Sequence, residues 1–187
     1  MNRPLTEALY ELAETAKRTA DQLGGQIEQA AALVRSTLEH GGTLLFCGNG
    51  GSAADAQHMA TEYVVRYMKN RRAYAAIALT TDTSLLTAAG NDLGFDHIFS
   101  RQVEALGKSG DLLIIHSTSG SSPNVIEAAK AARAQGLKVL SLSARDGGEL
   151  VAVSDLLLIV PTTRTDRAQE VHLCLQHLIC ESIEGTI

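Results

Sequence analysis

The sequence contains no tryptophan, and its 187 residues include only four tyrosines and three phenylalanines. This scarcity argues against a protein that binds bases or sugar rings by stacking them on exposed aromatic side chains. The three cysteines include no CxxC pair and lie in apolar runs, which excludes a secreted disulfide framework and favours buried thiols. No apolar run reaches the length of a membrane span, and no signal peptide is recognisable. We therefore expect a soluble, cytoplasmic protein.

The charge balance is acidic, because 16 Lys and Arg stand against 21 Asp and Glu and give a formal net charge of -5. Such a balance argues against bulk electrostatic binding to nucleic acid or to an anionic membrane. It does not exclude binding of a small anion, which needs only a few local hydrogen-bond donors. Hydrophobic residues make up 45% of the chain, as in ordinary globular domains. Together with the length, this composition predicts one domain over residues 1–187.

Two N-terminal helices are expected within residues 1–41. Apolar residues recur at spacings of three and four over residues 5–16 and again over 27–38. Gly24-Gly25 would separate the two helices, and Gly41-Gly42 would end the second. These helices could pack on the core of their own domain, on a neighbouring subunit, or on both.

After Gly42 the pattern changes to five short apolar runs that alternate with helical stretches. The runs are nearly continuous, which is typical of parallel strands covered by helices on both faces. We therefore predict an α/β fold with a doubly wound, five-stranded parallel sheet. The expected strands are residues 43–47, 75–79, 111–115, 138–142 and 155–160, and the expected helices are 52–68, 83–107 with a break between Gly90 and Gly94, 123–135, 147–153 and 167–184.

The first expected strand runs into a glycine-rich loop, Gly48-Asn49-Gly50-Gly51-Ser52, that leads into a helix. Glycines let backbone N–H groups approach an anion, and the helix N-terminus adds the positive end of its dipole. The match to a dinucleotide-binding fingerprint is weak, because the acidic residue after the second strand, Asp82, comes too late. A P-loop is excluded, since no Gly-Lys-Ser/Thr follows.

A second candidate loop follows the third expected strand. Residues 117–122 carry five hydroxyl groups and lead into a helix whose start is marked by Pro123. Ligands of such sheets bind at the carboxyl ends of the strands. There, hydroxyls and helix N–H groups can hold a phosphate without a cation. The alternative is a serine-rich loop that only caps the helix, but the number of hydroxyls favours the phosphate.

Candidate metal ligands and acid–base groups lie on two expected helices. His58 and Glu62 are four residues apart and share a helix face, where they could bind a metal or form a solvated pair. On the last helix, Gln169 and His172 are three residues apart, whereas His177 lies two turns from Gln169, a rise of roughly 12 Å. Local geometry therefore pairs Gln169 with His172. His177 could join the same site from a frayed helix start or from a neighbouring subunit.

Together, these motifs resemble the sugar-isomerase (SIS) domain family. The resemblance implies a three-layer αβα fold with an N-terminal helical segment, and a homotetramer whose active sites lie between subunits. It also implies an aldose–ketose isomerase that converts sedoheptulose 7-phosphate to D-glycero-D-manno-heptose 7-phosphate, the first step toward nucleotide-activated heptoses. The resembling blocks are Gly48–His58 with Glu62, Leu79–Ser84, Gly90–Phe95, Phe99–Glu104, Ser117–Gly120, Asp146–Gly148 and Gln169–His172.

The resemblance further implies roles for single residues. Glu62 and His177 would be the base and the acid of an enediol mechanism. One zinc ion per subunit would be held by His58, Glu62, Gln169 and His177, with His172 as the alternative to His177. The substrate would contact Asn49, Gly50, Gly51, Ser52, Glu62, Arg66, Asn91, Asp92, Ser117, Thr118, Ser119, Ser122, Asp166 and Gln169.

Two other functions occur among relatives of this kind. One is a non-catalytic tetrameric adaptor for the bacterial replication initiator, which lacks the acid–base pair that Glu62 and His177 would form here. The other is a sugar-phosphate sensor, which carries a DNA-binding domain that 187 residues would not accommodate. Two positions depart from the family pattern and bear on the exact sugar: Ser121 replaces a common Asn, and Ala144 replaces a usual Gly.

Overall fold

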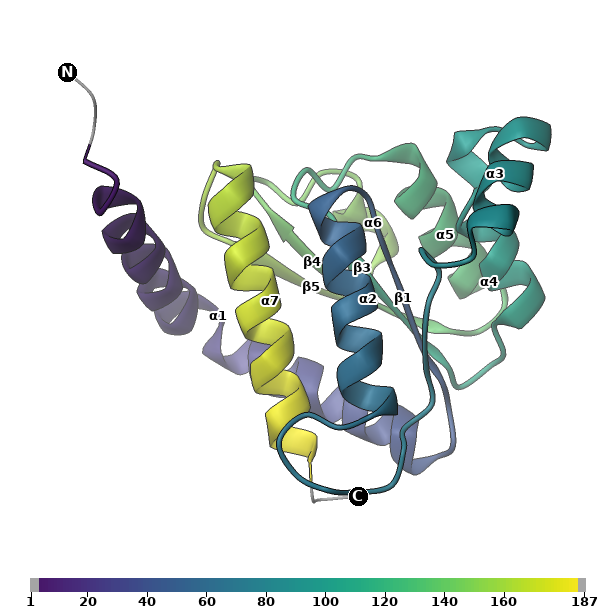
Figure 1. Ribbon diagram of the computed structural model, residues 1–187, viewed down its shortest axis with the longest axis horizontal. Helices are drawn as coiled ribbons and strands as arrows, with labels where there is room; N and C mark the ends of the chain where they lie inside the picture. Colours follow the sequence, from purple (N-terminus) through teal and green to yellow (C-terminus); the bar gives the residue numbers. More distant parts are fainter. Residues whose placement is uncertain (1–3, 185–187) are drawn as a thin grey trace.

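The computed structural model describes residues 4–184, which form three layers around a parallel sheet (Figure 1). The five strands pair in the order β2-β1-β3-β4-β5, and every pairing is parallel. The predicted α/β fold is therefore confirmed, as are all five strands to within a few residues. Their bounds are β1 Leu44–Gly48, β2 Ala76–Ala78, β3 Leu112–His116, β4 Lys138–Ala144 and β5 Leu156–Val160.

Two sets of helices cover the two faces of the sheet, because side chains along each buried strand alternate between the faces. Phe46 and Ile114 pack with α1, α2 and α7, whereas Leu45 and Ile115 pack with α3, α4, α5 and α6. No helix within residues 4–184 is long and apolar enough to cross a membrane. The helices are α1 Glu7–Glu39, α2 Gly51–Val64, α3 Thr83–Asp92, α4 Ser100–Leu106, α5 Pro123–Ala134, α6 Leu150–Val153 and α7 Thr165–Ile183, with a short 3-10 helix, η1, over Phe95–His97.

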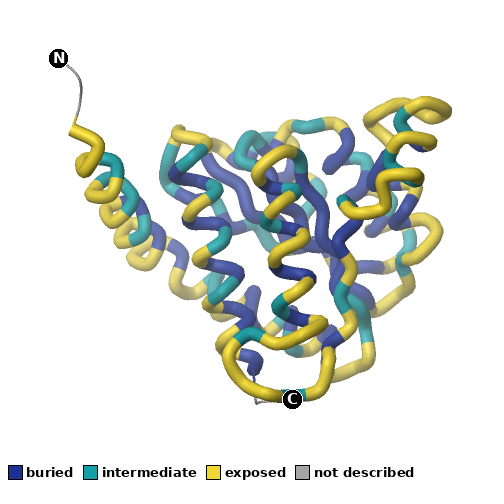
Figure 2. Tube along the Cα trace, viewed as in Figure 1, coloured by how far each residue is buried: buried dark blue, intermediate teal, exposed yellow. Residues whose placement is uncertain are grey.

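The prediction of two N-terminal helices is wrong, because α1 is one continuous helix of 33 residues. Gly24 and Gly25 lie in its middle on the exposed face, where neither would bring a Cβ near another atom. Each costs about 1 kcal/mol of helix propensity, and the packing of buried Ala30 and Val34 outweighs that cost. The first turns of α1 extend away from the sheet and are largely exposed (Figure 2). Residues 1–3 and 185–187 of the predicted domain lie outside the described residues.

Candidate functional site

The two candidate loops lie side by side at the edge of the sheet where the strand order reverses. β1 and β3 are neighbours, and Gly48 at the end of β1 pairs with His116 at the end of β3. Open α/β sheets bind ligands at such a switch point. A cavity of about 260 Å³ opens there, lined by Asn49, Gly50, Gly51, Ser52, His116, Ser117, Thr118, Ser119, Ser122, Thr165 and Gln169.

Three helix N-termini converge on this cavity. Gly51 is the first residue of α2, Ser122 precedes the first residue of α5, and Thr165 is the first residue of α7; all three residues line the cavity. Each N-terminus contributes free N–H groups and the positive end of a helix dipole. The side chains lining the cavity include hydroxyls but, among the described residues, no cation. This arrangement suits a phosphate group held by neutral donors.

A turn after β4 supports the hydroxyl-rich loop and accounts for the Asp146–Gly148 block. Gly120 has a φ of +66°, and a Cβ there would overlap the carbonyl oxygen of Gly147. Gly148 has a φ of +55°, and a Cβ on it would come within 2.7 Å of the Gly120 backbone. Only glycine combines this left-handed backbone with such close approach. The loop at the cavity is therefore held by direct backbone packing.

Asn124 is a site residue that the sequence analysis missed. Its carboxamide and that of Asn49 exchange two hydrogen bonds: Asn49 Nδ2 donates to Asn124 Oδ1 at 2.8 Å, and Asn124 Nδ2 donates to Asn49 Oδ1 at 2.9 Å. Asn124 is buried. The pair fixes the glycine-rich loop to the start of α5. The one signal in the sequence was an amide directly after Pro123, at a helix start.

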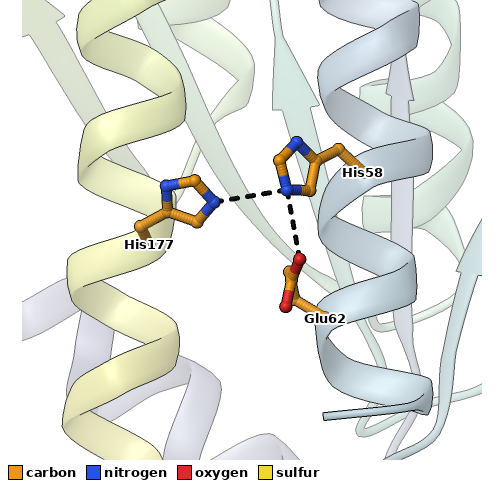
Figure 3. Close-up of side chains that lie close together, drawn as sticks. All are labelled: His58, Glu62 and His177. Atoms are coloured by element: carbon orange, nitrogen blue, oxygen red, sulfur yellow. Dashed lines mark hydrogen bonds and ion pairs between the residues drawn. The ribbon is translucent and has the colours of Figure 1, made fainter. Parts of the chain in front are cut away.

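A second cluster lies further along α2 and α7 and consists of His58, Glu62 and His177 (Figure 3). His58 Nε2 lies 3.1 Å from Glu62 Oε1 and 3.4 Å from His177 Nε2. One ligand atom from each residue lies within 4.8 Å of the other two. Two imidazole nitrogens and one carboxylate oxygen are a common donor set for zinc. The structure therefore brings together three of the four predicted metal ligands.

The partly buried His177 ring contacts two other rings. Tyr67 stacks on it with centroids 5.3 Å apart and planes 21° apart, and His58 meets it edge-on at 5.0 Å. Burial, with a smaller effect of nearby His58, lowers the pKa of His177, although Glu62 acts in the opposite direction. The neutral imidazole, which binds metals, is therefore favoured near neutral pH.

The structure does not bring His172 to this cluster. His172 is fully buried, and its Nε2 lies 3.0 Å from the carbonyl oxygen of Ser143. Burial lowers the pKa of His172 to about 4. Its neighbour His116, at the floor of the cavity, has a pKa lowered to about 3, mainly by burial and secondly by His172. Both histidines are therefore neutral parts of the core.

Gln169 lies at the cavity, not with the metal-ligand cluster. A Cβ on Gly51 would lie 2.5 Å from Gln169 Nε2, so the carboxamide packs directly on the glycine-rich loop. His177 lies two helical turns further along α7, roughly 12 Å in rise. The separation noted in the sequence therefore holds in the folded chain, and one subunit does not unite Gln169 with the cluster.

Besides Glu62, which lies in the metal-ligand cluster, four predicted substrate residues lie away from the cavity of the same chain. Arg66 is exposed just beyond α2. Asn91 and Asp92 are exposed at the end of α3, where Asn91 Nδ2 donates to Asp92 Oδ1 at 2.7 Å. Asp166 pairs with Arg164 and Arg167, and the Arg164 guanidinium is the main cause of its strongly lowered pKa. None of the four lines the cavity.

The family model described as "SIS domain" matches residues 9–144, and the chain belongs to this family. Among curated relatives, a phosphoheptose isomerase of Rhodospirillum rubrum is 51% identical over 161 residues, 86% of each chain. One of Neisseria meningitidis serogroup B is 54% identical over 162 residues, 85% of this chain and 82% of that relative.

Solved structures agree with the curated relatives. A phosphoheptose isomerase from Neisseria gonorrhoeae is 48% identical and superimposes with a TM-score of 0.91 over 97% of both chains. One from Francisella tularensis is 36% identical, with a TM-score of 0.93 over 96% of this chain and 95% of that one. Within the SIS domain family, the chain belongs to the phosphoheptose isomerases.

Proposed function

We propose that this chain is an aldose–ketose isomerase that converts sedoheptulose 7-phosphate to D-glycero-D-manno-heptose 7-phosphate. The observation that carries the proposal is that the cavity and the metal-ligand cluster lie one after the other along α2 and α7. A cavity suited to phosphate lies where the helices begin, and Glu62 with two histidines lies about two to three turns further on. An extended sugar phosphate likewise has its anion at one end and its reacting carbons at the other.

The proposed reaction transfers two protons within the sugar and has no leaving group. Glu62 removes a proton from C1 of the ketose while the neutral His177 imidazole donates its ring N–H proton to the C2 oxygen, which gives an enediol. His177 then takes the proton of the C1 hydroxyl, and Glu62 returns its proton to C2. The C1 oxygen becomes the aldehyde oxygen, and both side chains regain their starting states.

We also propose that His58, Glu62 and His177 hold one zinc ion. Their nitrogen and oxygen donors and mutual distances fit zinc, and the lowered pKa of His177 favours the form that binds a metal. When bound, zinc would polarise substrate oxygens. Gln169 would complete this set only from another subunit, since in its own chain it packs on Gly51.

The assembly we propose is a homotetramer with active sites between subunits. Arg66, Asn91 and Asp92 are exposed and lie apart from the cavity of their own chain. A neighbouring subunit is the simplest way to bring such side chains to a substrate. A cytoplasmic location stays a prediction of the sequence.

The test is direct incubation of the purified protein with sedoheptulose 7-phosphate and detection of the aldose product by NMR. We expect turnover, a loss of activity with chelator, and recovery when zinc is added back. Absence of product in all three conditions would contradict the proposed isomerase. Turnover that is unchanged by exhaustive chelation would support the proposed isomerase activity and contradict the proposed role of zinc.

A further inference from the structure

The segment that follows α2, residues 65–72, is held against the end of α7 by one carboxylate. We call this segment the strap; it passes close to the C-terminal end of α7 (Figure 1). Glu184 accepts hydrogen bonds from three successive backbone N–H groups of the strap: Tyr67 at 2.9 Å, and Met68 and Lys69 at 2.7 Å each. These charge-assisted bonds fix the backbone at Tyr67.

Arg71, at the far end of the strap, ties the same carboxylate to α2. Its Nε lies 3.4 Å from Glu184 Oε1, and only 6% of the Arg71 side chain and 2% of the Glu184 side chain are exposed. Nη1 donates to the carbonyl oxygen of Tyr63 at 2.8 Å, and Nη2 donates to that of Glu62 at 2.6 Å. Arg71 thus binds carbonyls at the C-terminal end of α2, including that of the proposed base.

Tyr67 is the strap residue that contacts the metal-ligand cluster. Its ring stacks on His177, while its backbone N–H is held by Glu184. Figure 3 shows that His177 on one helix points at His58 on the other, and that His58 in turn contacts Glu62. An imidazole in that position can rotate about its side-chain torsions unless a neighbour fixes it. Functional side chains of this kind depend on packing partners for their orientation.

We propose that Tyr67 is a positioning residue that orients His177 toward His58 and Glu62, and that Glu184 and Arg71 hold Tyr67 in place. The consequence for turnover rests on the proposed isomerase function, whereas the orientation of His177 does not. Tyr67 orients His177 by stacking the face of its ring on the imidazole. The Tyr67 hydroxyl is therefore not required for this role. The strap therefore links the C-terminal end of α7 to the orientation of the proposed acid.

The kinetic test compares Tyr67→Ala with Tyr67→Phe, and uses Met68→Ala as a control because that neighbouring side chain is exposed. We expect Tyr67→Ala to lower kcat about 10- to 100-fold, as misplacement of a reacting group does, with little change in KM. Tyr67→Phe and Met68→Ala should keep kcat within about threefold of the parent. A Tyr67→Ala variant with the parent kcat would overturn the proposal, as would Tyr67→Phe losing as much as Tyr67→Ala.

The second readout is the NMR signal of the His177 imidazole, assigned by its loss in His177→Asn. Removal of the Tyr67 ring should move this signal by removing a ring current, and Glu184→Gln should move it in the same direction. Tyr67→Phe should leave it in place. A His177 signal that is indifferent to Tyr67→Ala would overturn the positioning role. The expected shifts in a protein that does not turn over sedoheptulose 7-phosphate would instead reject the proposed function and keep the positioning role.

Discussion

His58 and His177 point their Nε2 atoms at each other across 3.4 Å, although 119 positions separate them in the chain. The reason is that α2 and α7 both begin at the carboxyl edge of the sheet and run side by side in the same direction (Figure 1). Gly51 meets Gln169 at the start of the two helices. Seven residues further along α2 and eight further along α7, His58 therefore meets His177.

Metal binding should depend on this pair. We expect one Zn²⁺ per subunit by isothermal titration calorimetry, and His177→Asn should weaken binding by more than the roughly 10- to 100-fold that follows loss of a ligand's hydrogen-bond partner. The matched control is His40→Asn, because His40 is exposed at the end of α1 and outside the cluster. Equal zinc affinity in His177→Asn and the parent would contradict the assignment.

Gly51 and Gln169 should act as one unit in binding the substrate. In Gly51→Ala the new methyl group would displace the Gln169 carboxamide, whose flexible end can move without unfolding the chain. We expect kcat/KM to fall about 10-fold or more, with a free energy of unfolding within about 1 kcal/mol of the parent.

The double variant identifies the cause. In a Gln169→Ala background, Gly51→Ala should cost little further activity, because the displaced group is already absent. If the losses in kcat/KM of the two single variants multiply in the double variant, the methyl group acts on the substrate directly and not through Gln169.

The sequence alone predicted the sheet and both loops of the cavity. Short, nearly continuous apolar runs such as 111–115 identify parallel strands because the whole signal lies within a few consecutive residues. The N-terminal helices were predicted wrongly for a related reason: Gly24-Gly25 is a local break signal, and the burial that overrides it comes from residues far along the chain.

The metal-ligand cluster was less accessible to sequence reasoning. Spacing on one helix favoured His172 as the partner of Gln169, whereas the structure buries His172 against Ser143 and brings His177 to His58. The period of α7 identifies the face that is buried against the core, but it does not say which residues beside that face meet α2. Asn124 and Tyr67 were missed because each acts through a partner, Asn49 and His177, that only the fold supplies.

Stability should fall with acid because of the two buried histidines beneath the cavity. The pKa of His116 is lowered to about 3 and that of His172 to about 4, against about 6.5 in the unfolded chain. Unfolding therefore takes up protons below pH 6.5, so this stability is fully present above that pH and is lost as pH falls toward 4 and then 3. The slope is up to about 1.4 kcal/mol per pH unit for each histidine.

Urea denaturation between pH 7 and 4.5 measures this effect. His172→Gln keeps a donor for the Ser143 carbonyl but does not titrate, so its free energy of unfolding should fall less steeply than that of the parent. His40→Gln, at an exposed site, should follow the parent. Identical slopes in His172→Gln and the parent would refute the assignment of the acid sensitivity to this histidine.

Gly120→Ala should damage the hydroxyl-rich loop. The left-handed backbone and the overlap of a Cβ with the Gly147 carbonyl leave no room for a methyl group. We expect a loss of about 2 kcal/mol or more in the free energy of unfolding, together with a raised KM, because Ser119 and Ser122 line the cavity on either side. Gly41→Ala is the control: it also has a positive φ but no atom near a Cβ, so it should lose stability without a change in KM.

Glu62 is the proposed base, and proton transfer in D₂O is the most direct test of that role. The parent protein should convert sedoheptulose 7-phosphate to an aldose that carries deuterium at C2, since the proposed base exchanges its proton with solvent before returning it. Glu62→Gln should form no aldose while keeping the oligomeric state of the parent by analytical ultracentrifugation. Aldose formation by Glu62→Gln at a rate near that of the parent would contradict the account.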